Sequence, residues 1–372
     1  MKRTFFVACC LLAAVNTAAD AGSVDLAING YGVGLGNSKN INGLRINFID
    51  RDVEKINGVN ITLWKPKPSP NGEINGISLG IIGFDAYKIT GLNVAIIGMY
   101  AEMLRGITLA GIGVESQNVR GFLFAGIAAG ATTVKGISLA GIGIGAQEVT
   151  GLFVGGIGAG ASDIRGISLA GIGFGAERMK GFSFSLIGMA ATQMTGLAIA
   201  GLGLAGDDIR GIFLAGLGIA ASDISGAAIT LFGVGGNTIN GLAVAGLGVG
   251  ASDISGITIT GLGVGGRRIR GLSLAIGGVG GRDLYGGFTG VLGVGGETVR
   301  GVALAGLYLK ATDYFEGFGT GAYSNIGEQR GVTIGLLNTA QELYGFQIGI
   351  LNYAGTNRTP FKLLPIVNYH GW

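Results

Sequence analysis

Glycine recurs at almost every fifteenth residue of this chain, and that period constrains the fold more than any other feature. Every step is 15 residues except one of 18, which contains the proline-rich stretch 65–70. A fixed period predicts a repeat protein in which each unit packs on its neighbours. The lead glycines are Gly43, Gly58, Gly76, Gly91, Gly106, Gly121, Gly136, Gly151, Gly166, Gly181, Gly196, Gly211, Gly226, Gly241, Gly256, Gly271, Gly286 and Gly301.

Within each repeat, the apolar residues follow the period of a β-strand. With the lead glycine as position 1, bulky apolar residues fill positions 2, 4, 7, 9 and 14, and polar residues gather at positions 12, 13 and 15. The repeat that starts at Gly166 is an example. A spacing of two residues is that of a strand, whereas each interior glycine would cost a helix about 1 kcal/mol.

The apolar alternation changes phase between positions 4 and 7. In a straight strand Leu169 and Ile172 would point to opposite sides, so we expect a bend at the glycine between them. With this bend, the residues at positions 2, 4, 7, 9, 11 and 14 are predicted to point inward, and small Ser, Ala and Gly residues outward. Position 14 is apolar or aromatic in every regular repeat from Gly91 to Gly301, the last being Tyr314.

The predicted fold class is all-β, with a β-solenoid of 15-residue coils about 4.8 Å apart. The alternative is an antiparallel outer-membrane β-barrel with one strand per repeat. Three features support that alternative: the predicted export of the chain, the terminal Trp372 and a weak 30-residue period at position 3. Such a barrel needs a polar lumen and aromatic girdles, whereas both sides of these strands would be apolar. The solenoid is therefore favoured.

The first 21 residues have the features of a secretory signal peptide. Lys2 and Arg3 precede the apolar stretch 5–15, and residues 19–21 offer a small-x-small cleavage site. Both cysteines of the chain lie in this leader. If the chain were instead a lipoprotein with Cys9 as its lipidated residue, only a short apolar segment would precede that cysteine. Cleavage would leave a mature chain without cysteine, so we expect packing and backbone hydrogen bonds to stabilise it.

We expect four segments along the chain. Residues 1–21 form the signal peptide. Residues 22–75 form N-terminal repeats or a cap, with a proline-rich loop at 65–73. Residues 76–315 form the regular glycine-rich repeats, and residues 316–372 form irregular C-terminal repeats and a cap.

No motif predicts a catalytic, cofactor-binding or metal-binding site. The stretches 201–206 and 261–266 match the dinucleotide fingerprint, but neither is followed by residues that predict the helix N-terminus which binds pyrophosphate. The single histidine, His370, is third from the end and is predicted to be an ordinary exposed side chain.

Charged residues are few and recur at fixed positions. Stacked coils would make Asp208 and Asp223 neighbours, able to share a Ca²⁺ ion, but Arg178 and Arg268 hold the same position elsewhere, so we expect solvated turn residues. The acidic residues at position 13 are Asp163, Asp208, Asp223, Asp253, Asp283 and Asp313. The densest positive cluster comprises Arg267, Arg268, Arg270 and Arg282, and it is either a contact for an anionic surface or a charged edge that keeps the protein soluble.

The C-terminal stretch resembles a family of bacterial surface-repeat proteins. The segment 331–355 contains GVTIGLLN and FQIGILN, and Leu364-Pro365-Ile366-Val367-Asn368 follows. These are similar to the GVxIGLxN repeats of 14–15 residues and the LPxxN ending of that family. The resemblance covers residues 331–368 well and the earlier repeats more loosely, where glycine replaces the repeat asparagine. It implies an exported envelope protein and transfers no functional residues.

The expected function is that of an exported structural or interaction protein of the cell surface or outer membrane, with the periplasm as a further location. No enzymatic activity and no cofactor are expected. Candidate partners are an envelope glycan, a lipid surface or a second copy of the chain, and membrane association is compatible with the sequence. Nucleic acid is not expected, because the net charge is only +3 and no basic run is present. The alternative function is transport or anchoring as an outer-membrane barrel.

Overall fold

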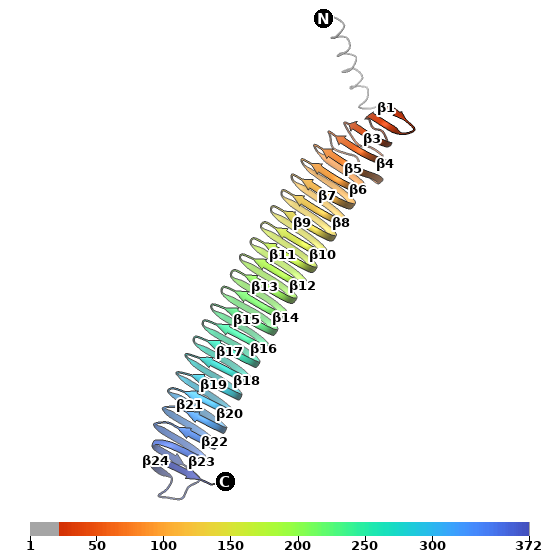
Figure 1. The fold of residues 1–372 in the computed structure, drawn as a ribbon. Coiled ribbons are helices and arrows are strands. Elements are labelled where there is room, and N and C mark those ends of the chain that lie inside the picture. The colour runs from red at the N-terminus through yellow and green to blue at the C-terminus, as the bar shows by residue number, and fades with distance from the viewer. Residues whose placement is uncertain (1–21, 372) are drawn as a thin grey trace, which may run out of the picture. The chain divides into compact units, whose positions relative to one another are not determined.

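The structure, a computed structural model, describes residues 22–371, so the predicted signal peptide lies outside the described residues. The fold is all-β, with 82% of the described residues in strands. The described residues divide into two compact units, 22–185 and 186–371. Each unit is a stack of β-coils (Figure 1), which confirms the predicted solenoid of 15-residue coils.

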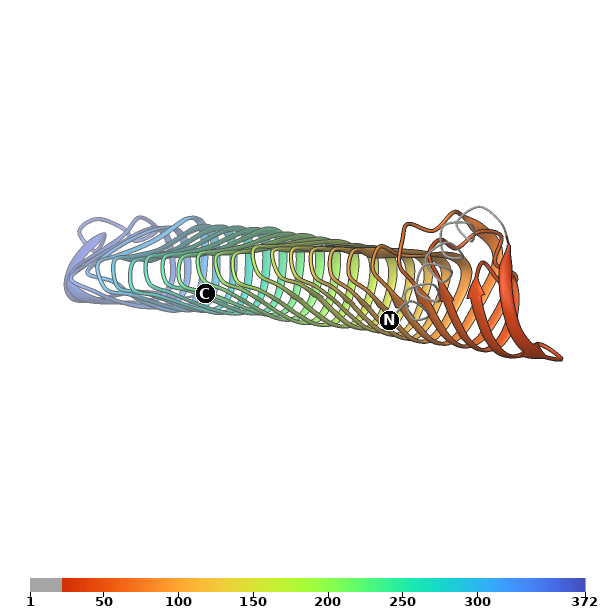
Figure 2. The same cartoon turned by 90° about the horizontal axis from the view of Figure 1, so that it is seen from above.

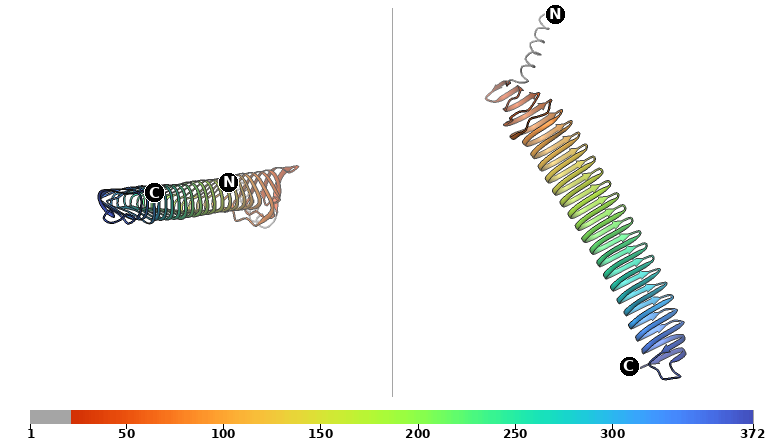
Figure 3. Two further views of the ribbon diagram at one scale, coloured as in Figure 1. Left: turned by 90° about the horizontal axis from the view of Figure 1, so that it is seen from below. Right: turned by 180° about the vertical axis from the view of Figure 1, so that it is seen from behind.

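Unit 1 begins with a hairpin and continues as coils that stack in chain order (Figures 1 and 3). β1 pairs antiparallel with β2, and every later pair up to β12 is parallel. The strands are β1 (Ser23–Ile28), β2 (Tyr31–Gly36), β3 (Asn40–Asn47), β4 (Lys55–Thr62), β5 (Ser69–Gly80), β6 (Gly83–Ala95), β7 (Gly98–Ala110), β8 (Gly113–Ala125), β9 (Ala128–Ala140), β10 (Gly143–Gly155), β11 (Gly158–Ala170) and β12 (Gly173–Ser185).

Unit 2 is a second stack, closed by a strand that runs in the opposite direction. Consecutive strands are parallel up to β23, and β24 pairs antiparallel with β23. The strands are β13 (Gly188–Ala200), β14 (Gly203–Ala215), β15 (Gly218–Thr230), β16 (Gly233–Ala245), β17 (Gly248–Thr260), β18 (Gly263–Ala275), β19 (Gly278–Gly290), β20 (Gly293–Ala305), β21 (Tyr308–Thr320), β22 (Tyr323–Ile334), β23 (Leu337–Ala354) and β24 (Leu363–His370).

The parallel pairing shows that the antiparallel alternative is wrong for the coils of both units. Residues pair with the residue one repeat later, as Gly151 does with Gly166 and Gly196 with Gly211. Strands joined by tight turns pair antiparallel, whereas parallel pairing needs a connection that returns the chain to its starting side. In each repeat that return is made within the coil itself.

Each regular coil turns at the lead glycine and at a bend. The lead glycines from Gly91 to Gly301 have positive φ angles between 103° and 134°, and a Cβ on Gly166 would lie 2.2 Å from the carbonyl oxygen of Gly151. Only glycine tolerates both conditions. The bend falls at positions 6 and 7, as at Gly171 and Ile172, which confirms the predicted place. We call positions 2–5 the short leg and positions 8–15 the long leg.

Burial corrects the predicted inward-facing set on the short leg. In the coil from Gly166, Ser168 and Ala170 are buried, while Ile167 and Ile172 are 46% and 51% exposed. Positions 3 and 5 therefore point inward and positions 2, 4 and 7 outward, the reverse of the prediction. On the long leg the prediction is right, because Phe174 and Met179 at positions 9 and 14 are buried.

The narrow space between the legs explains this reversal. Ser, Ala, Thr or Gly fills most inward positions of the short leg, where a bulky aliphatic side chain would collide with the opposite leg. In two coils a large inward residue at position 3 is followed by glycine at position 5, whereas Phe213 is followed by Ala215. Phe153 and Phe288 at position 3 are buried and are followed at position 5 by Gly155 and Gly290, where a Cβ would lie 2.1 and 2.2 Å from a carbonyl oxygen.

The coils near both ends depart from the regular pattern. Loops leave the first coils between β3 and β4 and between β4 and β5 (Figure 2). The second of these contains residues 65–68 of the proline-rich stretch, and β5 begins at Ser69, inside the predicted loop 65–73. The coil that starts at Gly301 carries one extra residue, so that Val299 pairs with Phe315. Phe315 is fully buried, and the prediction that Tyr314 points inward is wrong.

Candidate interaction surface

The outward side chains of the short leg and of the bend form an apolar face along unit 1. In the coil from Gly106, Ile107 at position 2 and Ile112 at position 7 are 47% and 49% exposed. The residues at position 7 form a column of isoleucines: Ile97, Ile112, Ile127, Ile142, Ile157 and Ile172. As an order-of-magnitude estimate, three coils expose roughly 600 Å² of apolar side chain, about the upper limit for the largest patch on an ordinary monomer. Patches beyond this size mark interaction sites.

Unit 2 has an apolar face of the same kind. Ile212 and Ile257 at position 2 are half exposed, and leucine replaces isoleucine in much of its position-7 column. Exposed members of that column are Leu202, Leu217, Leu247, Leu262, Leu292 and Leu307. We call the outward residues at positions 2, 4 and 7 of either unit the apolar face.

The long leg carries the charged residues, and several pair between coils. Arg178 forms an ion pair with Asp163, its neighbour in the adjacent coil, and its Nη2 donates to Asp163 Oδ2 at 2.6 Å. This hydrogen bond, with the arginine charge, lowers the pKa of the Asp163 carboxyl below its ordinary value. Arg268 donates to Asp253 at 2.5 Å and lowers its pKa in the same way. The arginines that interrupt the acidic column are thus its partners.

The structure brings the predicted neighbours Asp208 and Asp223 into register. Both carboxylate oxygens of Asp208 accept hydrogen bonds from Arg210, whose Nη2 and Nε donate at 2.7 and 3.0 Å. The pair therefore lacks the shared free carboxylates that a Ca²⁺ ion would need. Within residues 22–371, no three Asp, Glu, His or Cys side chains lie close enough to hold a metal ion.

The predicted arginine cluster is largely paired within unit 2. Arg267 and Arg268 both contact Asp253, and Arg282 lies 3.1 Å from Glu297. Arg270 lies over the ring of Tyr285 at 6.0 Å. Because carboxylates offset most of this charge, the cluster provides little field for an anionic partner.

Arginine and tyrosine alternate on the outside of the last coils. The guanidinium of Arg300 lies 5.8 Å from the ring centroid of Tyr285 and 5.0 Å from that of Tyr314, and Arg330 lies 5.6 Å from Tyr314 and 5.5 Å from Tyr344. Cation–π contacts at exposed sites stabilise by about 0.5–1 kcal/mol each. The alternation ties neighbouring coils together and was not predicted from the sequence.

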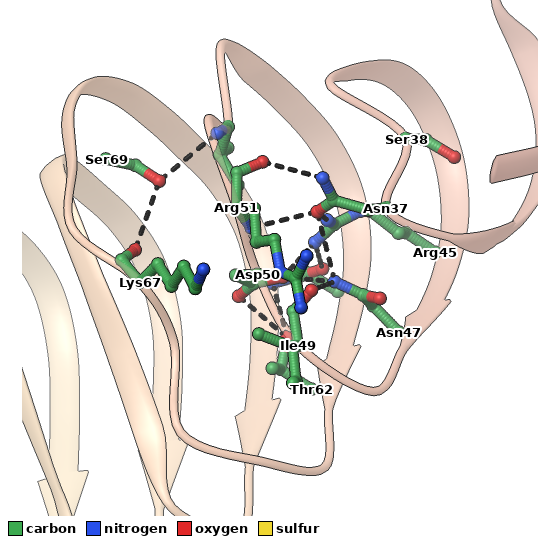
Figure 4. Close-up of polar contacts among 12 residues, drawn as sticks. Asn37, Ser38, Arg45, Asn47, Ile49, Asp50, Arg51, Thr62, Lys67 and Ser69 are labelled. Carbon is green, nitrogen blue, oxygen red and sulfur yellow. Dashed lines mark hydrogen bonds and ion pairs between the residues drawn. The ribbon is translucent and has the colours of Figure 1, made fainter. Parts of the chain in front are cut away.

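A buried polar network lies in the first coils of unit 1 (Figure 4). Arg45 forms an ion pair with Asp50 on the loop after β3, and both side chains are buried. Arg45 Nη1 donates to Asn60 Oδ1 at 2.9 Å and Nη2 to Asn37 Oδ1 at 3.1 Å. Thr62 donates to the other carboxylate oxygen of Asp50 at 2.9 Å. Arg45, Asp50, Asn60 and Thr62 are all buried, so the network joins the loop to the coils rather than forming a ligand site.

His370 lies on β24 beside an open hollow of about 550 Å³, which Asn357, Phe361 and Asn368 help to line. The side chain is half-buried. Its Nδ1 is 2.6 Å from Oδ1 of Asn357, and its ring contacts Tyr344 edge-on at 5.9 Å between centroids. These contacts hold the imidazole against the last coil.

The two dinucleotide-like stretches lead into strands. β14 and β18 begin inside them, so neither offers the helix N-terminus that a pyrophosphate needs. Residues 22–371 also contain no helix with the length and hydropathy to cross a membrane.

Comparisons of the chain with protein-family models, with curated proteins and with solved structures give no match. The solenoid of glycine-containing repeats is observed, and the resemblance of its C-terminal stretch to the surface-repeat proteins stays a prediction. The surface with the clearest capacity for binding is the apolar face.

Proposed function

We propose that the chain is an exported, non-catalytic interaction protein of the cell envelope, which binds its partner through the apolar face. The observation that carries the proposal is the exposure of branched aliphatic side chains at the same positions in coil after coil, as at Ile107, Ile137 and Ile167. Burial of such residues stabilises by about 25 cal/mol per Å², and a partner is what would bury them.

Export is supported by the predicted leader at 1–21 and by the resemblance of residues 331–368 to bacterial surface-repeat proteins. A cell-surface or outer-membrane location fits both features. The non-catalytic role is supported by the chemistry of the apolar face, whose aliphatic side chains supply no acid, base or nucleophile.

The test is fractionation of source cells that express the tagged chain. The unaltered chain is expected in the envelope fraction, and a variant with Ile107→Ser, Ile137→Ser and Ile167→Ser is expected to shift to the soluble fraction. The matched control carries Thr132→Ser, Gln147→Ser and Glu177→Ser, three exposed substitutions at position 12 of the long leg, and should fractionate like the unaltered chain. Circular dichroism checks that all three fold. Retention of the isoleucine variant in the envelope, or an unaltered chain in the cytoplasm, would contradict the proposal.

A further inference from the structure

A column of basic residues borders the apolar face of unit 1. Position 15 comes directly before the lead glycine, and position 2 directly after it, so both lie at the same turn of the coil and both side chains point outward. The basic residues at position 15 are Arg105, Arg120, Lys135, Arg165 and Lys180. We call them the basic column.

The members of the basic column stack on one another. Arg105 pairs in register with Arg120, and Arg120 with Lys135. Thr150 separates these three from Arg165 and Lys180, which pair with each other. Adjacent parallel strands lie about 4.8 Å apart, and like charges at that distance repel each other and destabilise the sheet.

Ion pairs within the described residues do not neutralise this column, and the one carboxylate with a resolved electrostatic effect from it is Asp163, whose pKa is lowered in part by the charge of Arg165. Among the described residues, no carboxylate lies within 4.0 Å of a charged nitrogen of the five side chains. The cation at position 13, Arg178, shows the contrast, because it is paired with Asp163. Within residues 22–371, the five cations of the basic column are therefore without an ion-pair partner at the border of the apolar face.

The apolar face offers no acid that a second copy could bring to the column. From position 2 to position 9, the coils of unit 1 that start between Gly91 and Gly166 contain no charged residue: the segments are 92–99, 107–114, 122–129, 137–144, 152–159 and 167–174. Two copies packed face to face would therefore bury apolar surface but leave both basic columns without counter-charges. A partner with an apolar layer and an anionic border fits better.

We propose that unit 1 lies with its apolar face on an anionic lipid surface. Ile107, Ile137 and Ile167 enter the boundary between headgroups and acyl chains. Arg105, Arg120 and Lys135 contact the lipid phosphates. Amphipathic elements that bind at membrane interfaces combine an apolar side with basic residues in this way, and each basic residue near an anionic leaflet strengthens binding about fivefold. The inference rests on the proposed function, because it identifies the partner of the same face.

The test is sedimentation of the purified chain with vesicles of phosphatidylcholine, alone or mixed with phosphatidylglycerol. We expect binding to the mixed vesicles that weakens as salt rises. Combined Arg105→Gln, Arg120→Gln and Lys135→Gln should reduce this binding on the order of 100-fold. Combined Ile107→Ser, Ile137→Ser and Ile167→Ser should reduce binding to both kinds of vesicle.

The matched control removes three cations outside the basic column, at positions 12 and 13, with Lys88→Gln, Arg178→Gln and Arg282→Gln. It has the same net charge as the basic-column variant and should retain nearly full binding. Equal loss in both variants would show an effect of net charge alone and would overturn the inference, as would absence of binding by the unaltered chain.

Sedimentation velocity separates failure of this inference from failure of the proposed function. A dimer that the isoleucine substitutions dissociate, without vesicle binding, would make a second copy the occupant of the face and overturn the lipid inference alone. Isoleucine variants that match the unaltered chain in vesicle binding, self-association and cell fractionation would overturn both.

Discussion

Glycine serves two different purposes in these coils, and the residue scale separates them. At the lead position, the positive φ and the approach of the preceding coil exclude any side chain, as at Gly151, where a Cβ would lie 2.0 Å from the oxygen of Gly136. At position 10, Gly145 has nothing within 4 Å of a Cβ. The repeat therefore depends on some glycines for geometry, and others occupy open sites.

This difference predicts unequal outcomes for two glycine-to-alanine changes that lie six residues apart. Gly151→Ala should destabilise unit 1 by about 2–4 kcal/mol, because it combines backbone strain with a steric clash. Gly145→Ala should change stability by less than about 1 kcal/mol. Thermal unfolding followed by circular dichroism measures both, and a similar loss in the two variants would disprove the distinction.

The buried pair of Arg45 and Asp50 is also a residue-scale feature. Asp50→Ala leaves the Arg45 guanidinium buried without its counter-charge, so the first coils should lose about 3–5 kcal/mol. Hydrogen exchange of β3 and β4 measures this local loss. Lys39→Ala, which removes an exposed pair with Asp52, is the control and should stay within about 0.5 kcal/mol. Unchanged exchange in the Asp50 variant would count against the structural role.

At the scale of the strand, ion pairs join neighbouring long legs. The pKa of Asp163 is lowered by the hydrogen bond from Arg178. A lowered folded-state pKa means that the stabilisation is fully present above the ordinary aspartate pKa of about 4, and is lost as the pH falls through the folded-state value.

Asp163→Asn should therefore lower the melting temperature by about 1–2 °C at pH 7, as is typical for an exposed pair. The difference from the unaltered chain should shrink as the pH falls and vanish once the native carboxyl is protonated too. Melting curves at a series of pH values below 7 test this. Asp223→Asn, at the same position but with no arginine at ion-pair distance among the described residues, is the control and should change the melting temperature at pH 7 by less.

The strands also show how far the sequence specifies this fold. The 15-residue period, strand spacing and bend could be predicted, since each leaves a glycine or a phase change in the sequence. Which side of the short leg faces inward could not, because Ser168 and Ile167 give an alternation that either orientation satisfies. The free volume between the legs decides it. The Arg45 network was not predicted either, because the sequence does not show which inward side chains the first coils bring together. The apolar face follows only once the orientation of the short leg is known.

At the scale of the whole molecule, each unit gains its stability from contacts between adjacent coils, so the energy is nearly a sum of neighbour terms. The end coils alone differ. In unit 2, β24 pairs along Gly345–Tyr353 of β23 (Figure 3) and covers an edge that would otherwise be open to another chain.

Deletion of residues 136–150 should accordingly leave a folded protein, because Lys135 then precedes Gly151 in unchanged register. The melting temperature should move by only a few degrees. Deletion of 136–142 is the control: it removes a lead glycine, a short leg and a bend, and should unfold the coils around it. Circular dichroism and size-exclusion chromatography compare the two. Unfolding by the 15-residue deletion would mean that the coils are not interchangeable.

The constant register between coils also has a genetic consequence. Recombination between misaligned repeats of the gene would add or remove whole multiples of 15 codons, which keeps the reading frame and returns each corner glycine to its place above the preceding one. Copy number is then free to drift without a folding penalty, while the hairpin of β1 and β2 and the final strand β24 are inherited as fixed ends. Lineages could adjust the extent of the binding face one coil at a time.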